Sequence, residues 1–176
     1  GLVVPIGAWV LEEACSRAVE WWHALPAVDR FRLAVNLSSR QLVQADLADL
    51  VAGVLARTGL RPDFLCVEIT ETTLMEDIDA GVGAVKALKA LGVRVAIDDF
   101  GTGYSSLAYL KRLPIDTLKI DKEFVGDITT DPDDEAITAT VITMAHSLGL
   151  DVIAEGVETP EQLDYLKVLG CEFAQG

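Results

Sequence analysis

The sequence predicts an α/β fold in which about six parallel strands alternate with helices, as in an incomplete TIM-like (β/α) barrel. Short apolar stretches recur along the chain, and most are followed by a helical pattern. These stretches carry few charges before their last residues, which is typical of a parallel sheet covered on both faces. Each ends on a carboxylate, an amide or a lysine, and α/β barrels place their chemistry at that end of the strand.

The elements are expected in regular order. A first helix is predicted over about residues 6–24. The predicted strands are LAVN (33–36), FLCVEI (64–69), VAID (95–98), TLKID (117–121), DVIAE (151–155) and EFAQ (172–175). The helices between them show apolar faces made of Leu47, Leu50, Val51, Val54 and Leu55; of Ile78, Val82, Val85 and Leu88; and of Ile137, Val141, Met144, Ala145 and Leu148. Glycines end these three helices at Gly59, Gly92 and Gly149. Thr159 and Gln162 form a capping box that predicts a last helix.

We expect one partial domain over residues 1–176. No strand precedes the first helix and no helix follows the last strand, whereas a complete barrel has about 250 residues. The first two strands and the final helix would then be missing, and such a fragment is expected to be poorly soluble or dimeric because its sheet edges are open. A complete six-stranded open sheet is the alternative. Small residues beneath the polar strand ends, such as Ala34 below Asn36, favour the barrel.

The amino-acid composition limits the classes of function that this chain can have. The net charge of −14 argues against a surface that coats DNA or RNA, but it permits a small anionic ligand if metal ions supply positive charge. Cys15, Cys66 and Cys171 are too far apart in sequence to suggest a disulfide frame or a zinc site. No signal peptide or membrane-spanning run is visible. A cytoplasmic location is therefore expected, with any membrane tether in other domains of the parent protein.

Oxygen donors dominate the predicted strand ends. The residues concerned are Asn36, Glu68, Asp98, Asp99, Lys119, Asp121, Glu155 and Gln175. Magnesium and manganese prefer such ligands, whereas zinc prefers histidine and cysteine. His23 and His146 fall in predicted helices and receive no role.

Asp98 and Asp99 are the most informative pair. Strand alternation points them apart, so one faces the barrel axis while the other approaches from the loop. Two carboxylates 4 Å apart repel by about 4 kcal/mol at an effective dielectric near 20, and a divalent cation would remove that cost. A solvated acidic loop is the alternative.

Three further residues allow two interpretations each. Lys119 either pairs with a carboxylate or orients a water or phosphate oxygen. Glu71 either caps the following helix or tethers the loop after Asp99. Glu158 is expected to be an acid that favours the start of the next helix, rather than a functional group.

Two other motifs overlap the segment around Asp98 and Asp99. The DFG triplet at 99–101 is typical of protein kinases, but no other kinase motif accompanies it. Gly101-x-Gly103-x-x-Ser106, with Asp121 farther along, is close to a dinucleotide-binding fingerprint. Against a nicotinamide-binding oxidoreductase, a serine replaces the third glycine, and two aspartates precede the turn where a pyrophosphate would lie.

Together the motifs resemble one family, the EAL domains, which are bacterial cyclic di-GMP phosphodiesterases with an α/β barrel. The matching segments are NLSSRQL (36–42), EITET (68–72), IDDFGTGYSSL (97–107), LKIDKEFV (118–125), IAEGVET (153–159) and QG (175–176). The Glu-Ala-Leu motif itself is absent and is expected on a strand before Gly1. Its glutamate would also bind the first metal, so a fragment without it is expected to be weakly active or inactive.

The resemblance implies specific roles. Asn36, Glu68 and Asp98 would bind a first Mg²⁺ or Mn²⁺ ion, and Asp98, Asp99 and Glu155 a second. Lys119 would hold or activate the attacking water, with Glu155 as candidate general base. Arg40, Asp121 and Gln175 would contact the substrate, and Glu71 would anchor the loop after Asp99.

The implied reaction is hydrolysis of cyclic di-GMP to linear pGpG by two divalent ions. The resemblance also implies a homodimer formed through the loop and helix after Asp99, and a regulatory domain N-terminal to this one in the parent. A non-catalytic module that binds cyclic di-GMP or protein partners is the alternative from another class.

Overall fold

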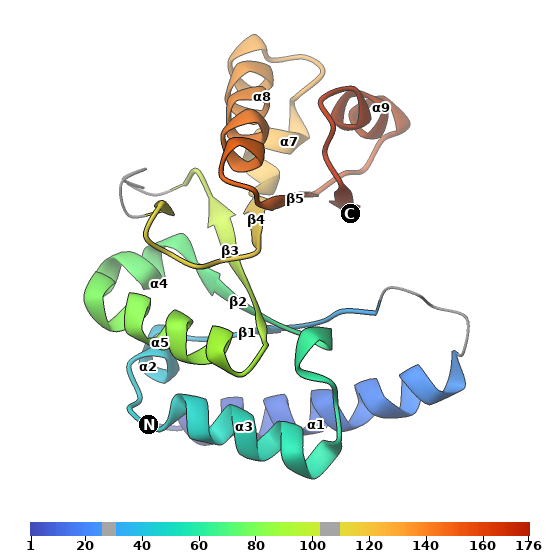
Figure 1. Cartoon of the computed structure of the whole chain (residues 1–176). Coiled ribbons are helices and arrows are strands. Elements are labelled where there is room, and N and C mark those ends of the chain that lie inside the picture. The colour runs from blue at the N-terminus through green and yellow to red at the C-terminus, as the bar shows by residue number, and fades with distance from the viewer. Residues whose placement is uncertain (26–30, 103–109) are drawn as a thin grey trace. The chain divides into compact units, whose positions relative to one another are not determined.

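The computed structural model describes residues 1–25, 31–102 and 110–176 (Figure 1). The chain forms two compact units. The first comprises Gly1–Ile69, Thr73–Val95 and Arg112–Pro114, and the second comprises Thr70–Thr72, Ala96–Lys111 and Ile115–Gly176. Among the described residues, no helix is both long enough and apolar enough to cross a membrane.

The first unit is built from long helices and two paired strands. Helices α1 (Val3–Ala24) and α3 (Leu47–Thr58) lie side by side (Figure 1). Strand β1 (Leu33–Asn36) pairs in parallel with β2 (Leu65–Thr70). The remaining elements are α2 (Ser39–Leu42), the 3₁₀ turn η1 (Pro62–Phe64) and α5 (Ile78–Ala90), while α4 (Glu71–Glu76) has residues in both units.

Apolar burial holds this unit together. Leu11, Cys15 and Ala18 of α1 are buried, as are Val51 and Val54 of α3. Burial of a side chain of this size typically stabilises a fold by about 1.5–3 kcal/mol.

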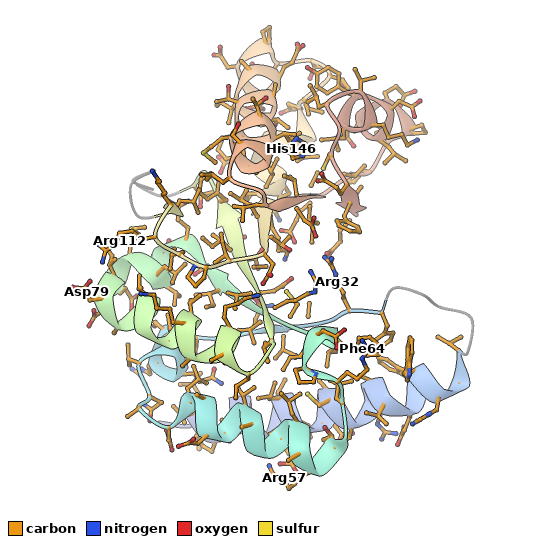
Figure 2. The ribbon with its side chains drawn as sticks, in the orientation of Figure 1. Arg32, Arg57, Phe64, Asp79, Arg112 and His146 are labelled. Carbon is orange, nitrogen blue, oxygen red and sulfur yellow. The ribbon has the colours of Figure 1, made fainter. Side chains whose placement is uncertain are left out.

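Side chains also join segments of this unit that are distant in sequence. Arg57 on α3, which Figure 2 labels, pairs with Glu12 on α1 at 2.8 Å. The rings of Trp22 and Phe64 meet edge to face with centroids 4.5 Å apart, which fixes η1 against the end of α1.

The second unit contains the parallel strands β3 (Arg94–Phe100, from Ala96 on), β4 (Thr117–Ile120), β5 (Asp151–Glu155) and β6 (Phe173–Gln175), paired in chain order. Helices α7 (Lys122–Gly126), α8 (Pro132–Ser147) and α9 (Pro160–Val168) follow β4 and β5. Leu118 and Ile120 of β4 and Val152 of β5 are buried, so the central strands of this sheet place apolar side chains in the core.

His146, on the last turn of α8, contacts Glu172, the residue before β6. Its Nε2 lies 2.9 Å from Glu172 Oε1 (Figure 2). The other Glu172 oxygen accepts a hydrogen bond of 2.9 Å from the Val152 N–H. His146, for which no functional role is predicted, therefore makes a structural contact.

Several predicted boundaries need correction. Helix α1 begins at Val3 rather than near residue 6, because a helix tolerates Pro5 in its first turn. The predicted apolar face of α8 is partly wrong: Ile137 and Leu148 are exposed, whereas Thr138 and Ile142 are buried. The helix therefore packs through a face that is rotated from the most apolar stripe.

The short helices α2, α4 and α7 were not predicted, because four to six residues are too few to show a helical period. Other signals were read correctly. Gly59 ends α3 in the left-handed conformation with φ 75°. The Thr159–Gln162 capping box starts α9.

Candidate metal centre

Three carboxylates gather at the carboxyl ends of strands in the second unit. Oxygen atoms of Asp98, Asp99 and Glu155 all lie within 4.8 Å of one another. Asp98 is buried, and the other two are half-buried. Hard divalent cations bind several carboxylate oxygens at once, so the donor set suits magnesium or manganese.

A local irregularity brings the two adjacent aspartates together. In a regular strand, Asp98 and Asp99 would point to opposite faces. The pairing of β3 with β4 shifts register between Ile97 and Phe100, and Asp99 adopts a positive φ of 53°. Left-handed backbone costs an ordinary residue roughly 1–2 kcal/mol. With this backbone conformation the Asp99 carboxylate lies near that of Asp98, which strand alternation alone does not predict.

Lys119 lies between two of these acids. Its Nζ is 2.8 Å from Asp98 Oδ1 and 2.7 Å from Glu155 Oε1, and its side chain is 4% exposed. Lys119 is thus paired with carboxylates, which is one of the two interpretations that the sequence leaves open. Because β4 lies between β3 and β5, its lysine reaches acids on both neighbouring strands.

The third acid has no such lysine contact among the described residues. The pKa of Asp99 is raised above its ordinary value, first because burial disfavours the charge, then because of the neighbouring Asp98 charge and a hydrogen bond with Asp121. The single ammonium of Lys119 therefore does not neutralise the negative charge of the three acids. This excess of negative charge favours the binding of a cation.

Asp121 and Gln175 lie beside this cluster. Asp121 also starts α7, because its Oδ1 accepts a hydrogen bond of 2.7 Å from the Glu123 N–H. Gln175 lies opposite Glu155 in the register of β5 and β6, and its side chain is exposed. Its carbonyl accepts a hydrogen bond of 3.1 Å from the Val157 N–H.

Glu71 tethers the segment after Asp99. The Gly101 N–H donates a hydrogen bond of 2.9 Å to Glu71 Oε2, and Glu71 is 2% exposed. Glu71 is also the first residue of α4, so the structure shows both this hydrogen bond and a position at the start of the helix. The rest of the loop, including Gly103 and Ser106 of the dinucleotide fingerprint and much of the predicted dimer contact, lies outside the described residues.

Two further predicted ligands belong to the first unit. Asn36 and Glu68 are register partners at the carboxyl ends of β1 and β2. Asn36 is exposed, and Glu68 is buried at 7% exposure. The Leu37 N–H donates a hydrogen bond of 2.9 Å to the Glu68 carbonyl. Arg40, the predicted substrate contact, is exposed on α2.

One contact of Gln162 is not predicted by the sequence. The sequence predicts this residue as part of a capping box, and in the structure its amide nitrogen also donates to the Gly126 carbonyl at 2.8 Å. Nothing local in the sequence encodes this contact, because Gly126 lies on another helix. Glu158, predicted to be a helix-start acid, is exposed next to the N-cap residue Thr159.

Comparison with known proteins gives a consistent result. The family model described as the EAL domain matches residues 1–176. The chain is 47% identical over 176 residues to the bifunctional diguanylate cyclase/cyclic di-GMP phosphodiesterase MucR of Pseudomonas aeruginosa, covering 100% of this chain and 25% of MucR. It spans about a quarter of the length of the curated relatives it matches.

Solved structures of EAL proteins also align with this chain over most of its length. The PaMucR phosphodiesterase in complex with c-di-GMP aligns with a TM-score of 0.91 and 46% identity, over 97% of this chain and 68% of that chain. The manganese/cy-diGMP complex of Klebsiella pneumoniae BlrP1 aligns with a TM-score of 0.80 and 36% identity, over 94% and 43%. These likenesses confirm the predicted fold class, an incomplete TIM-like barrel, over the open-sheet alternative.

Proposed function

Because this chain belongs to the EAL domain family, we propose that it hydrolyses cyclic di-GMP to linear pGpG in a reaction that depends on divalent cations. The observation that carries this proposal is the cluster of Asp98, Asp99 and Glu155 around a buried lysine. A pocket with this excess of acid would repel a ligand with two anionic phosphodiesters unless cations were bound there.

The ligand assignment follows the oxygen donors. We assign Asn36, Glu68 and Asp98 to one Mg²⁺ or Mn²⁺ ion, and Asp98, Asp99 and Glu155 to a second. When bound, the two ions would neutralise the phosphate and the charge that develops in the transition state. Support comes from the strand-end positions of these residues and from the manganese in the BlrP1 complex.

The protein side chains would handle protons and orientation. Lys119 Nζ, fixed by two carboxylates, is held where it can donate a hydrogen bond to a water or phosphate oxygen. Glu155 would take the proton from the attacking water as the new P–O bond forms. The bond to the leaving ribose oxygen breaks in line, and that oxygen is protonated. Arg40, Asp121 and Gln175 would contact the substrate.

Assembly is part of the proposal. Glu71 would hold the segment after Asp99 in its productive position through the Gly101 amide. That segment and the helix after it would form a homodimer. A regulatory domain would lie N-terminal to this one in the longer protein, as the greater length of the relatives suggests.

The test is a product analysis. The full-length protein is incubated with cyclic di-GMP and Mn²⁺, and the nucleotides are separated by chromatography. We expect pGpG to accumulate with Mn²⁺ and not with chelator. Tight binding of cyclic di-GMP without any product would instead identify a binding module. Saturable NAD binding without hydrolysis would favour the dinucleotide-binding alternative.

A further inference from the structure

Gln162, at the start of α9, uses both ends of its amide to join two segments. Its Oε1 accepts hydrogen bonds from the Glu158 and Thr159 N–H groups at 2.8 and 2.9 Å. Its Nε2 donates to the Gly126 carbonyl at 2.8 Å and to the Val125 carbonyl at 3.3 Å. The residue is 5% exposed, so these bonds are made away from water, where losing one leaves a buried polar group unsatisfied.

Both joined segments start close to the candidate metal centre, one at Asp121 and the other directly after Glu155. Helix α7 follows its N-cap, Asp121, which comes directly after the end of β4, and ends at Gly126. The other segment starts directly after Glu155 and reaches the N-cap of α9 at Thr159. Gln162 therefore joins the end of α7, at Gly126, to the end of the segment after Glu155, at Thr159.

The same two segments also touch near the metal centre. Gly156 has a φ of 68°, and a Cβ built there would lie 2.5 Å from Lys122 Cβ. The loop and α7 are thus packed closely at one end and hydrogen-bonded through Gln162 at the other. A five-residue helix has little stability of its own, so its orientation depends on such contacts.

We propose that Gln162 is a positioning residue, which clamps α7 to the loop after Glu155 and thereby sets the separation of the Asp121 and Glu155 carboxylates. This inference rests on the proposed function, because those carboxylates matter only if the cluster binds cations and substrate. Some residues orient metal ligands without binding the metal themselves. Substituting such a residue typically lowers metal affinity or activity by about 10- to 100-fold.

Two matched variants separate clamping from helix capping. Gln162→Glu keeps an acceptor for the Glu158 and Thr159 N–H groups but cannot donate to the carbonyls of α7. Thr159→Val removes the hydroxyl that accepts from the Gln162 N–H at 3.2 Å and leaves the amide clamp intact. The second variant therefore weakens the cap of α9 alone, and only the first releases α7.

The experiment measures three quantities in the full-length protein: amide hydrogen exchange over residues 122–126, Mn²⁺ affinity by calorimetry, and kcat with cyclic di-GMP. For Gln162→Glu we expect faster exchange in α7 and a loss of about 10-fold or more in Mn²⁺ affinity or kcat. Thr159→Val should stay within about twofold of wild type in all three. If Gln162→Glu does not fold, Gln162→Met, which keeps the volume, carries the same expectation.

Two results would overturn the inference. One is α7 exchange, Mn²⁺ affinity and kcat in the Gln162 variant that all match wild type. The other is an equal loss in Thr159→Val, which would reduce Gln162 to a helix cap. A wild-type protein that hydrolyses no cyclic di-GMP would refute the proposed function instead, while exchange and Mn²⁺ affinity would still decide the role of Gln162.

Discussion

Lys119 Nζ lies 2.8 Å from Asp98 Oδ1, and the two side chains are 4% and 12% exposed. The pair comes from neighbouring strands, β4 and β3, and it sits where both strands reach their carboxyl ends. The lysine also contacts Glu155, so a single ammonium is shared by two acids, with Asp99 close to both. Without a metal, the cluster therefore has more negative than positive charge. We expect divalent cations to change the free energy of unfolding.

Lys119→Met is expected to destabilise the metal-free protein. Removing one partner from a buried ion pair typically costs about 3–5 kcal/mol, because the remaining charges lose their compensation. Mn²⁺ should restore part of the loss, since a cation bound only by the folded state stabilises it. Urea unfolding with and without Mn²⁺ measures both effects. Lys167→Met is the matched control, because Lys167 pairs with Asp164 on the exposed face of α9. An equally small change in both variants would contradict the account.

Asp99→Gly is expected to stabilise the metal-free protein by about 1 kcal/mol, because glycine adopts the positive φ without strain. Relief of the repulsion from Asp98 and Glu155 adds to this gain. The variant should lose the stabilisation that Mn²⁺ gives the wild type. Thermal unfolding of the wild type, Asp99→Gly and Asp99→Asn tests the prediction, since the asparagine variant relieves only the charge. Lower metal-free stability of Asp99→Gly would show that the Asp99 backbone is not strained.

Cys15 gives a prediction about pH. The thiol is fully buried, and burial raises its pKa to about 11. Between the ordinary thiol pKa and this value the unfolded chain releases the proton while the folded chain retains it, so stability falls as pH rises. A shift of this size corresponds to at most about 3 kcal/mol. Unfolding free energies of the wild type and Cys15→Ala, compared from pH 8 to 10.5, should show a steeper decline for the wild type. Parallel curves would contradict the shift.

Much of the fold could be predicted because its strands are apolar runs that end in polar residues. The capping box at Thr159 and the glycine end of α3 at Gly59 are local signals, and both were read correctly. The exposed Ile137 on α8 was misjudged because the sequence shows an apolar stripe but not which side of the helix meets the core. Tertiary packing decides that side.

The candidate site, like the fold, could be predicted from the sequence only in part. Strand-end positions predicted the grouping of Asp98 and Glu155, because parallel strands end at the same edge of a sheet. The approach of Asp99 to Asp98 depends on a register shift that strand periodicity does not encode. The link from Gln162 to Gly126 joins residues far apart in sequence and also required the structure.

Turnover of cyclic di-GMP by the wild type and Asp98→Asn, with Mn²⁺ and then with excess chelator, tests the central claim most directly. Asp98 is the ligand assigned to both cations, and its asparagine variant loses the charge while keeping the shape. The account predicts pGpG formation by the wild type with Mn²⁺, with none above background in chelator or from Asp98→Asn. Wild-type rates in the variant, or undiminished hydrolysis in chelator, would contradict a catalytic metal centre at these carboxylates.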